Sequence, residues 1–356
     1  SMEMAINRFI LSQPQFGKSS TPGQAIENIQ ALKAMMANLP TQTKRTEETD
    51  SFQQFSTVPP LAYVANWTAN ITQADTMLES SAGIGGLAVF AKNAGARIVA
   101  NELSKRRAAL LKETGIPDEL LIEDGEQIAN LLRPMGIRPT VTVINPPFST
   151  AATRGVKTTM NAAKHLEAAL NSMPEGGRLV AIVGSGMAMN MPTFAGWWTK
   201  MQGKYHVRAN IQVNGAEYAK YGTTWDNQLV VIDKVTAPAG AAPVVGRVES
   251  IDELPALLDT IRNERPRVSE SISGAIGGTR PSRPASNGSP RNEASGTSST
   301  TSQRPARPEP TGARVAEQVS QSEQSTGSGS NRARLDQSPA GNTAGERGDS
   351  EQESGG

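Results

Sequence analysis

Cysteine is absent from the 356-residue sequence, which excludes disulfide bonds and thiolate metal sites. Histidine occurs only twice, too seldom for a histidine-rich metal centre, and we interpret both residues, His165 and His206, as structural. Apolar runs long enough to span a bilayer, about 18 residues or more, are also missing. The N-terminus lacks the basic and then apolar layout of a secretory signal. We therefore expect no metal, no membrane partner and a cytoplasmic location.

Aromatic residues are scarce, with seven Phe, four Trp and four Tyr, and the last of them is Trp225. From Pro266 to Gly356 the chain is dominated by Ser, Gly, Pro, Thr, and charged or amide residues. Such a segment cannot bury enough apolar surface to offset an ordering cost of roughly 1–2 kcal/mol per residue. We predict that residues 266–356 form a disordered tail, a solvated linker rather than a nucleic-acid tether. The formal net charge of +1 neither favours nor excludes a nucleic-acid partner.

The rest of the chain divides into three parts. Residues 1–50 contain a helical pattern that starts with Thr21 as N-cap and Pro22, and we expect a helical extension and a linker there. Residues 51–235 alternate short apolar runs with amphipathic helical runs, which predicts an α/β domain with a Rossmann-like, mixed sheet. Residues 236–265 are expected to be a linker with a short helix. The seven expected strands are 75–79, 97–101, 119–123, 140–144, 178–183, 205–213 and 228–232, the last two forming a hairpin at the sheet edge.

The tetrapeptide Asn145-Pro146-Pro147-Phe148 directly follows the fourth expected strand. Open α/β sheets place their sites at the carboxyl ends of strands. Because proline lacks an N–H group, the carbonyls of Asn145 and Pro146 can act as pure acceptors. Accepting both hydrogens of an exocyclic amine would localise the lone pair of its nitrogen, and Phe148 could stack on the attached ring. A tight turn is the alternative, and the rarity of the motif favours a site.

A glycine-rich segment follows the first expected strand and precedes a helix. It runs from Glu79 to Gly86, and small residues there would let the backbone approach a ligand closely at a helix N-terminus. The spacing matches neither a dinucleotide fingerprint nor a phosphate loop, so methionine or nucleoside binding fits better, with a structural turn equally open. The candidate ligand residues are Glu79, Ser81, Ala82, Gly83 and Gly85.

Two further acids follow the second and third expected strands. Glu102 could accept hydrogen bonds from ribose hydroxyls, or it could be a surface acid. Asp124 could accept from an adenine amine, or it could cap a helix. Ahead of the first strand, Phe55, Ser56 and Thr57 could close a cofactor loop from above, or they could belong to an extended proline-containing segment.

Taken in order, these pieces resemble the N6-adenine DNA methyltransferase family over residues 50–235. The resemblance implies a class I fold, S-adenosylmethionine as cofactor, cofactor contacts from the residues named above including Asn145, catalysis by the tetrapeptide, and DNA as partner. The sequence is more similar still to the methyltransferase domain fused to strawberry-notch-type helicases of plasmids and phages. That likeness implies a helicase or another phage or plasmid protein as partner, self-modification or anti-restriction as role, and a bacterial host cytoplasm as location. The residues that carry it are 54–57, 145–149, 165–170, 176–182, 218–223 and 229–234.

Other functions remain open at this point. Methylation of adenine or guanine N2 in RNA, or of a protein glutamine, would use a planar amine and the same Asn-Pro-Pro chemistry. A catalytically inactive nucleic-acid-binding or packaging module could also retain the fold.

Overall fold

The computed structural model describes residues 2–39, 57–147, 160–216 and 225–268, which belong to one compact unit. Most of the predicted tail and the predicted site residues Phe55, Ser56 and Phe148 lie outside these ranges. The strands are β1 Thr76–Glu79, β2 Arg97–Asn101, β3 Glu119–Leu121, β4 Val141–Ile144, β5 Arg178–Gly184, β6 His206–Val213, β7 Asn227–Asp233 and β8 Val244–Val248. The α-helices are α1 Met2–Leu11, α2 Pro22–Ala37, α4 Pro59–Ala69, α5 Ala88–Asn93, α6 Lys105–Thr114, α7 Ile128–Leu132, α8 Asn161–Ser172, α9 Ala195–Lys204 and α10 Leu254–Asn263. The short 3-10 helices are η1 Pro14–Gly17, η2 Gly125–Gln127, η3 Ser185–Met187, η4 Pro192–Phe194 and η6 Ile251–Glu253.

The strands form a mixed sheet of eight strands in the order β3-β2-β1-β4-β5-β7-β6-β8, which confirms the predicted α/β class. The five strands from β3 to β5 are parallel, because helical connections return the chain between them. β7 runs antiparallel to both β5 and β6. β1 and β4 are therefore adjacent near the middle of the sheet, and their carboxyl ends lie side by side.

The sheet has one strand more than predicted, and its last strands are placed differently. β7 pairs with β6 as expected, but it lies in the interior, and β8 pairs with β6 to take the edge. Four of the five residues of β8 are exposed, and only Val248 is buried. An exposed strand that contains Gly246 has no alternating apolar pattern to reveal it.

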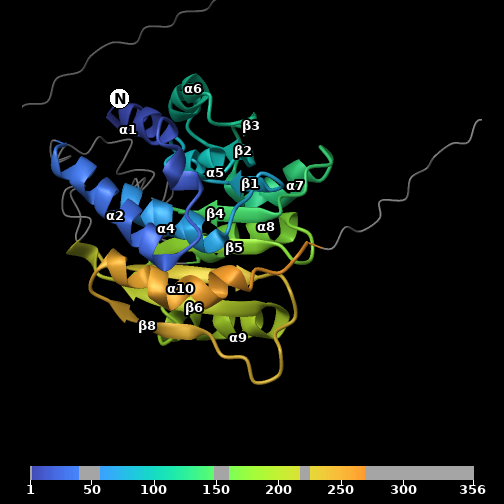
Figure 1. The fold of residues 1–356 in the computed structure, drawn as a ribbon. Coiled ribbons are helices and arrows are strands. Elements are labelled where there is room, and N and C mark those ends of the chain that lie inside the picture. Colours follow the sequence, from blue (N-terminus) through green and yellow to red (C-terminus); the bar gives the residue numbers. More distant parts are fainter. Residues whose placement is uncertain (1, 40–56, 148–159, 217–224, 269–356) are drawn as a thin grey trace, which may run out of the picture. The chain divides into compact units, whose positions relative to one another are not determined.

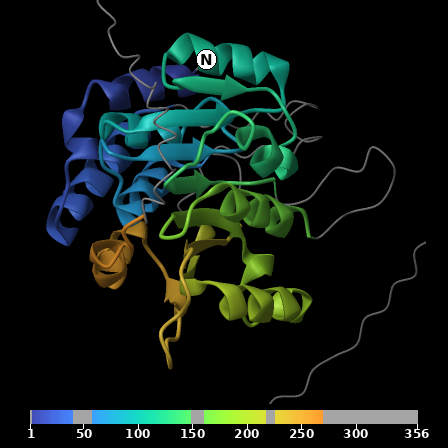
Figure 2. The same ribbon diagram turned by 90° about the vertical axis from the view of Figure 1, so that its right-hand side faces the viewer.

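Helices cover both faces of the sheet (Figures 1 and 2). One core cluster contains residues of α1, α2, α4, α5 and α10, and a second contains residues of α8 and α9. Successive residues of β1 point to opposite faces, since Met77 belongs to the first cluster and Leu78 packs with α7. Burial on both faces explains the continuous apolar runs of the parallel strands.

Helix α4 is the main element that the sequence did not predict. Pro59 and Pro60, which one of the two interpretations placed in an extended segment, start this helix, where a missing N–H group costs nothing. All eleven residues of α4 are buried. A helix without a polar face has no 3.6-residue alternation, so its pattern gives no amphipathic signal.

The short helix expected within residues 236–265 is present as α10, and it packs into the same core as the preceding strands. Leu254, Leu258 and Ile261 lie on one face of α10 and are buried in the first core cluster. Arg265 then donates from Nη1 to Asp75 Oδ2 over 2.9 Å, just ahead of β1. The end of the described chain is therefore tied back to the first strand.

Candidate functional site

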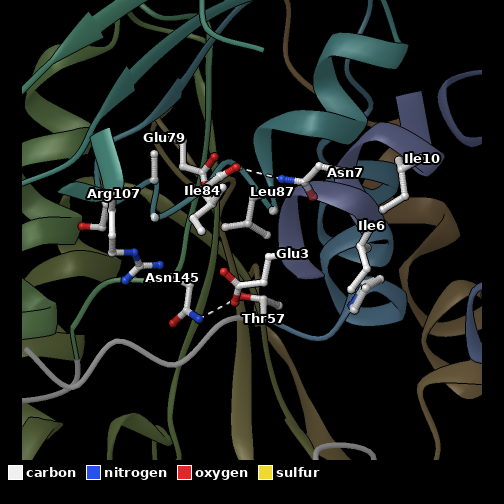
Figure 3. A pocket seen from close by; sticks show the side chains of 15 residues that line it. Glu3, Ile6, Asn7, Ile10, Thr57, Glu79, Ile84, Leu87, Arg107 and Asn145 are labelled. Atoms are coloured by element: carbon white, nitrogen blue, oxygen red, sulfur yellow. Dashed lines mark hydrogen bonds between the residues drawn. The ribbon is translucent and has the colours of Figure 1, made fainter. Parts of the chain in front are cut away.

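A pocket lies at the carboxyl ends of β1 and β4, where the predicted catalytic and cofactor segments meet (Figure 3). The space between its lining residues, together with the part that is open to solvent, amounts to about 600 Å³. The residues that line it are Glu3, Ile6, Asn7, Ile10, Thr57, Pro59, Glu79, Ser81, Ala82, Gly83, Ile84, Gly86, Leu87, Arg107 and Asn145.

The glycine-rich segment forms a loop between β1 and α5 along this pocket. Gly83 and Gly85 have φ angles of +58° and +85°, a region that side-chain-bearing residues rarely adopt. A Cβ atom on Gly83 would lie 2.3 Å from Arg107 Nη2, and one on Gly85 would lie 2.9 Å from Leu111 Cδ1. The positive φ angles favour glycine at these two positions, whereas the neighbouring Arg107 and Leu111 side chains could move aside.

Glu79 ends β1 and is buried beneath the loop, with 2% of its surface exposed. Its Oε2 accepts a hydrogen bond of 2.8 Å from the Ala88 N–H at the start of α5. Burial raises the pKa of Glu79 well above its ordinary value, and the nearby charge of Glu102 adds to this, while the Ala88 and Leu87 N–H groups oppose it. The floor of the pocket therefore disfavours a full negative charge.

The raised pKa of Glu79 predicts how Glu79→Gln will behave. A carboxyl group with a folded pKa above its unfolded value contributes stability below the unfolded pKa, and this contribution is lost as pH rises through the folded pKa. Glutamine keeps an acceptor for the Ala88 N–H group without the charge. We expect the variant to be more stable than the wild type at pH 8, on the order of 1 kcal/mol, with a smaller difference at pH 5.

Urea unfolding at both pH values measures this difference. Glu113→Gln on α6 is the matched control, because Glu113 is exposed and its substitution removes no buried charge. A stability difference between wild type and Glu79→Gln that stays constant from pH 5 to pH 8 would contradict the interpretation.

Asn145 follows β4 directly and lines the same pocket as the glycine loop. Its Nδ2 donates to Thr57 Oγ1 over 2.8 Å, as Figure 3 shows. This bond orients the amide, because the acceptor Oδ1 then lies on the other side of the group. The following turn is held from α8, where buried Asn161 donates from Nδ2 to the Pro147 carbonyl over 3.5 Å.

The two other predicted acids make local contacts outside the lining of this pocket. Buried Glu102 accepts from the Gly83 N–H at 2.7 Å and from the Ser104 N–H at 2.9 Å. Exposed Asp124 accepts from the Glu126 N–H at 2.9 Å and caps η2, the alternative raised from the sequence. Their predicted ribose and adenine contacts remain predictions.

Several residues of the site were not predicted from the sequence. Helix α1 forms one wall of the pocket, and buried Asn7 donates from Nδ2 to the Ile84 carbonyl at the tip of the glycine loop over 2.7 Å. Arg107 contributes a cation from α6. A polar residue such as Asn7 on the buried side of an apolar helix is the one signal that could have indicated this wall.

Asn101 is a further residue that sequence reasoning missed, and it connects three strand ends near the site. Its Nδ2 donates to the carbonyls of Ser80 and Glu123, and its Oδ1 accepts from the Glu123 N–H at 3.0 Å. A buried asparagine at the end of β2 thus fixes both the glycine loop and the segment that leads to Asp124.

No group of three or more His, Asp or Glu residues within the described ranges is placed to hold a metal ion. None of the helices in these ranges is long and apolar enough to cross a membrane.

Comparison with known proteins gives likenesses of fold only. No protein-family model and no curated protein matches the sequence. A modification subunit assigned to a type I restriction enzyme of Vibrio vulnificus has 15% identity and a TM-score of 0.46, covering 67% of this chain and 58% of that one. A type I restriction-modification methyltransferase subunit of Streptococcus thermophilus has 13% identity and a TM-score of 0.46, covering 58% of this chain and 53% of that one.

A protein of Pyrococcus horikoshii assigned as an RNA methyltransferase has 16% identity and a TM-score of 0.45, covering 59% of this chain and 99% of that one. The chain therefore spans little more than half the length of the two restriction-system subunits. Likenesses of this size occur between proteins of many activities, so they assign none to this chain.

Proposed function

We propose that the protein is an S-adenosylmethionine-dependent methyltransferase that acts on the exocyclic amine of a nucleic-acid base, with adenine N6 in DNA as the first choice. The observation that carries the proposal is the position of Asn145. Its side chain lines the same pocket as Glu79 and the glycine loop, although these residues are far apart in the sequence. An amine acceptor and a cofactor loop that share one pocket are what direct group transfer requires.

The lining of the pocket fits S-adenosylmethionine. Gly83 lines the pocket without a side chain, so the loop backbone can approach a ligand closely there. Ile6, Ile84 and Leu87 supply apolar surface, and polar or charged groups lie around them. We propose Thr57, Glu79, Ser81, Ala82, Gly83, Gly85, Glu102, Asp124 and Asn145 as cofactor-binding residues, together with Phe55 and Ser56.

The residues of the tetrapeptide would hold the amine for transfer. Asn145 Oδ1 and the Pro146 carbonyl each accept one hydrogen of the planar amine, which returns the nitrogen lone pair from the ring to the nitrogen. Phe148, outside the described residues, would stack on the base after it is flipped out of its helix. When bound, the cofactor supplies a methyl group on a positively charged sulfur that leaves as a neutral thioether. The methylated nitrogen is then cationic and acidic and releases one proton to water, so no strong base is required of the protein, and alignment supplies most of the acceleration.

The choice of DNA as substrate rests on the resemblance to N6-adenine DNA methyltransferases. In this chain, as in that family, a segment such as 55–60 precedes the first strand. RNA adenine, guanine N2 and protein glutamine present the same planar amine and are the second candidates. The proposed mobile-element role, in self-modification or anti-restriction with a helicase or another phage or plasmid protein as partner, rests on the resemblance to the domain fused to strawberry-notch-type helicases.

Product analysis tests the proposal. The full chain is incubated with S-adenosylmethionine carrying a labelled methyl group and with duplex DNA, single-stranded DNA or RNA, and the nucleosides are separated by mass spectrometry. We expect labelled N6-methyl-2′-deoxyadenosine from DNA. A labelled RNA nucleoside would redirect the substrate assignment. Binding of the cofactor without any transfer would favour the inactive module, and absence of cofactor binding would overturn the proposal.

A further inference from the structure

Arg107 places a guanidinium group in the pocket, where the proposed mechanism gives it no role. It belongs to the first turn of α6, whose N-cap Ser104 accepts from the Arg107 N–H. The residue is half-buried, and the guanidinium lies against Gly83 so closely that a Cβ there would contact it at 2.3 Å. Within the described residues this guanidinium donates no hydrogen bond and forms no ion pair, but its charge lowers the pKa of Glu79 against the larger effect of burial.

The frame that holds Arg107 is rigid, because Glu102 connects α6 to the glycine loop. One carboxylate oxygen of Glu102 accepts from the Gly83 N–H and the other from the Ser104 N–H. The start of α6 and the glycine loop are therefore fixed to one another by a single buried side chain. Arg107 lies over the loop at the position that this connection sets.

The composition of the pocket indicates which end of a cofactor Arg107 faces. Glu102 and Asp124, the residues predicted for ribose and adenine, do not line this pocket, whereas Asn145 does. In S-adenosylmethionine the sulfur that must face Asn145 joins the adenosine to an amino-acid chain. A pocket with Asn145 but without the adenosine residues fits that amino-acid end, which carries a carboxylate and an ammonium group.

We propose that Arg107 binds the carboxylate at the amino-acid end of the cofactor. This inference rests on the proposed function. Arg107 is the only cationic side chain among the described lining residues, and a guanidinium offers several N–H donors to both oxygens of a carboxylate. Glu3, from the α1 wall of the same pocket, supplies an opposite charge suited to the ammonium group. Together α6 and α1 recognise the two charges of an amino acid from different sides.

Calorimetric titration of the full chain tests this role without relying on activity. The two ligands are S-adenosylhomocysteine and its decarboxylated form, S-adenosyl-3-thiopropylamine, which keeps the ammonium group and lacks only the carboxylate. We expect the wild type to bind the first about 10- to 100-fold more tightly than the second, the usual size of a charge-assisted hydrogen bond. Arg107→Met should remove most of this preference, and Arg107→Lys should keep part of it.

Lys105→Met is the matched control, because it removes one exposed positive charge from the same turn of α6 and should keep the full preference. The inference is overturned if Arg107→Met keeps the wild-type preference for S-adenosylhomocysteine, or if it weakens the binding of both ligands equally. It is also overturned if the variant weakens only the binding of nucleic acid. Failure of the wild type to bind either ligand would instead reject the proposed function. Circular dichroism confirms that each variant is folded before titration.

Discussion

Replacement of Asn145 by alanine is expected to lower the rate of methyl transfer by about 100- to 1,000-fold, the usual cost of removing one oriented polar group from an active site. The proposed reaction depends on two acceptors for the amine, and this variant deletes one of them. Because the side chain is only half-buried after β4, the fold should survive. Single-turnover transfer of a labelled methyl group measures the effect, and calorimetry should show cofactor affinity changed by less than tenfold.

Asn130→Ala is the matched control, since Asn130 is an exposed asparagine of α7 whose recorded side-chain contact is with Gln127. It should transfer methyl groups at the wild-type rate. Thr57→Val separates orientation from chemistry, because it removes only the hydroxyl that accepts from Asn145 Nδ2. An intermediate loss is expected for Thr57→Val. Full activity of Asn145→Ala would show that the tetrapeptide is a turn and not a site.

Replacement of Asp233 by asparagine is expected to cost about 3–5 kcal/mol of unfolding free energy. Asp233 at the end of β7 is fully buried and accepts from Arg178 Nε at 2.6 Å and from Arg178 Nη2 at 2.9 Å. Arg208 also donates to it, over 3.3 Å. Without the carboxylate, a buried guanidinium loses its counter-charge, and this is what makes the variant unstable. Chemical denaturation of variant and wild type measures the loss.

The control for this prediction is Lys200→Met, which breaks an ion pair with Glu167 in which the lysine side chain is 50% exposed. Surface pairs of this kind contribute about 0–1 kcal/mol. The Arg178–Asp233 pair lies at the start of β5, away from the pocket. The folded fraction of Asp233→Asn should therefore bind S-adenosylhomocysteine with unchanged affinity. A loss below about 1 kcal/mol would show that the pair is dispensable.

The elements that could be predicted from the sequence are those with a strong local pattern. The parallel strands have continuous apolar runs, and Thr21-Pro22 is a recognisable helix start that the structure confirms as a capping box with Gln24. Helix α4 and strand β8 lack such patterns for opposite reasons, since the first is buried on every side and the second is almost wholly exposed. Apolar residues recur periodically only when one side of an element faces the core and the other faces solvent, and neither α4 nor β8 is placed in this way.

The site divides in a similar way. Asn145, Glu79 and the glycine loop follow strands in the sequence, so the rule that sites lie at carboxyl ends of strands identifies them. The α1 wall and Arg107 reach the pocket through tertiary packing, which no spacing encodes. Glu102 lies where a ribose ligand is expected and contacts Gly83 and Ser104, and its role in binding ribose stays a prediction.

The contact between Arg265 and Asp75 bears on where the chain can be cut. A recombinant fragment cut after residue 235, where the sequence places the domain boundary, would leave Asp75 without its cation and uncover the side of α4 on which α10 packs. Because Asp75 also receives the Thr140 hydroxyl at 2.7 Å, the same cut would loosen the starts of β1 and β4 together. Any excised catalytic fragment should therefore extend beyond Arg265.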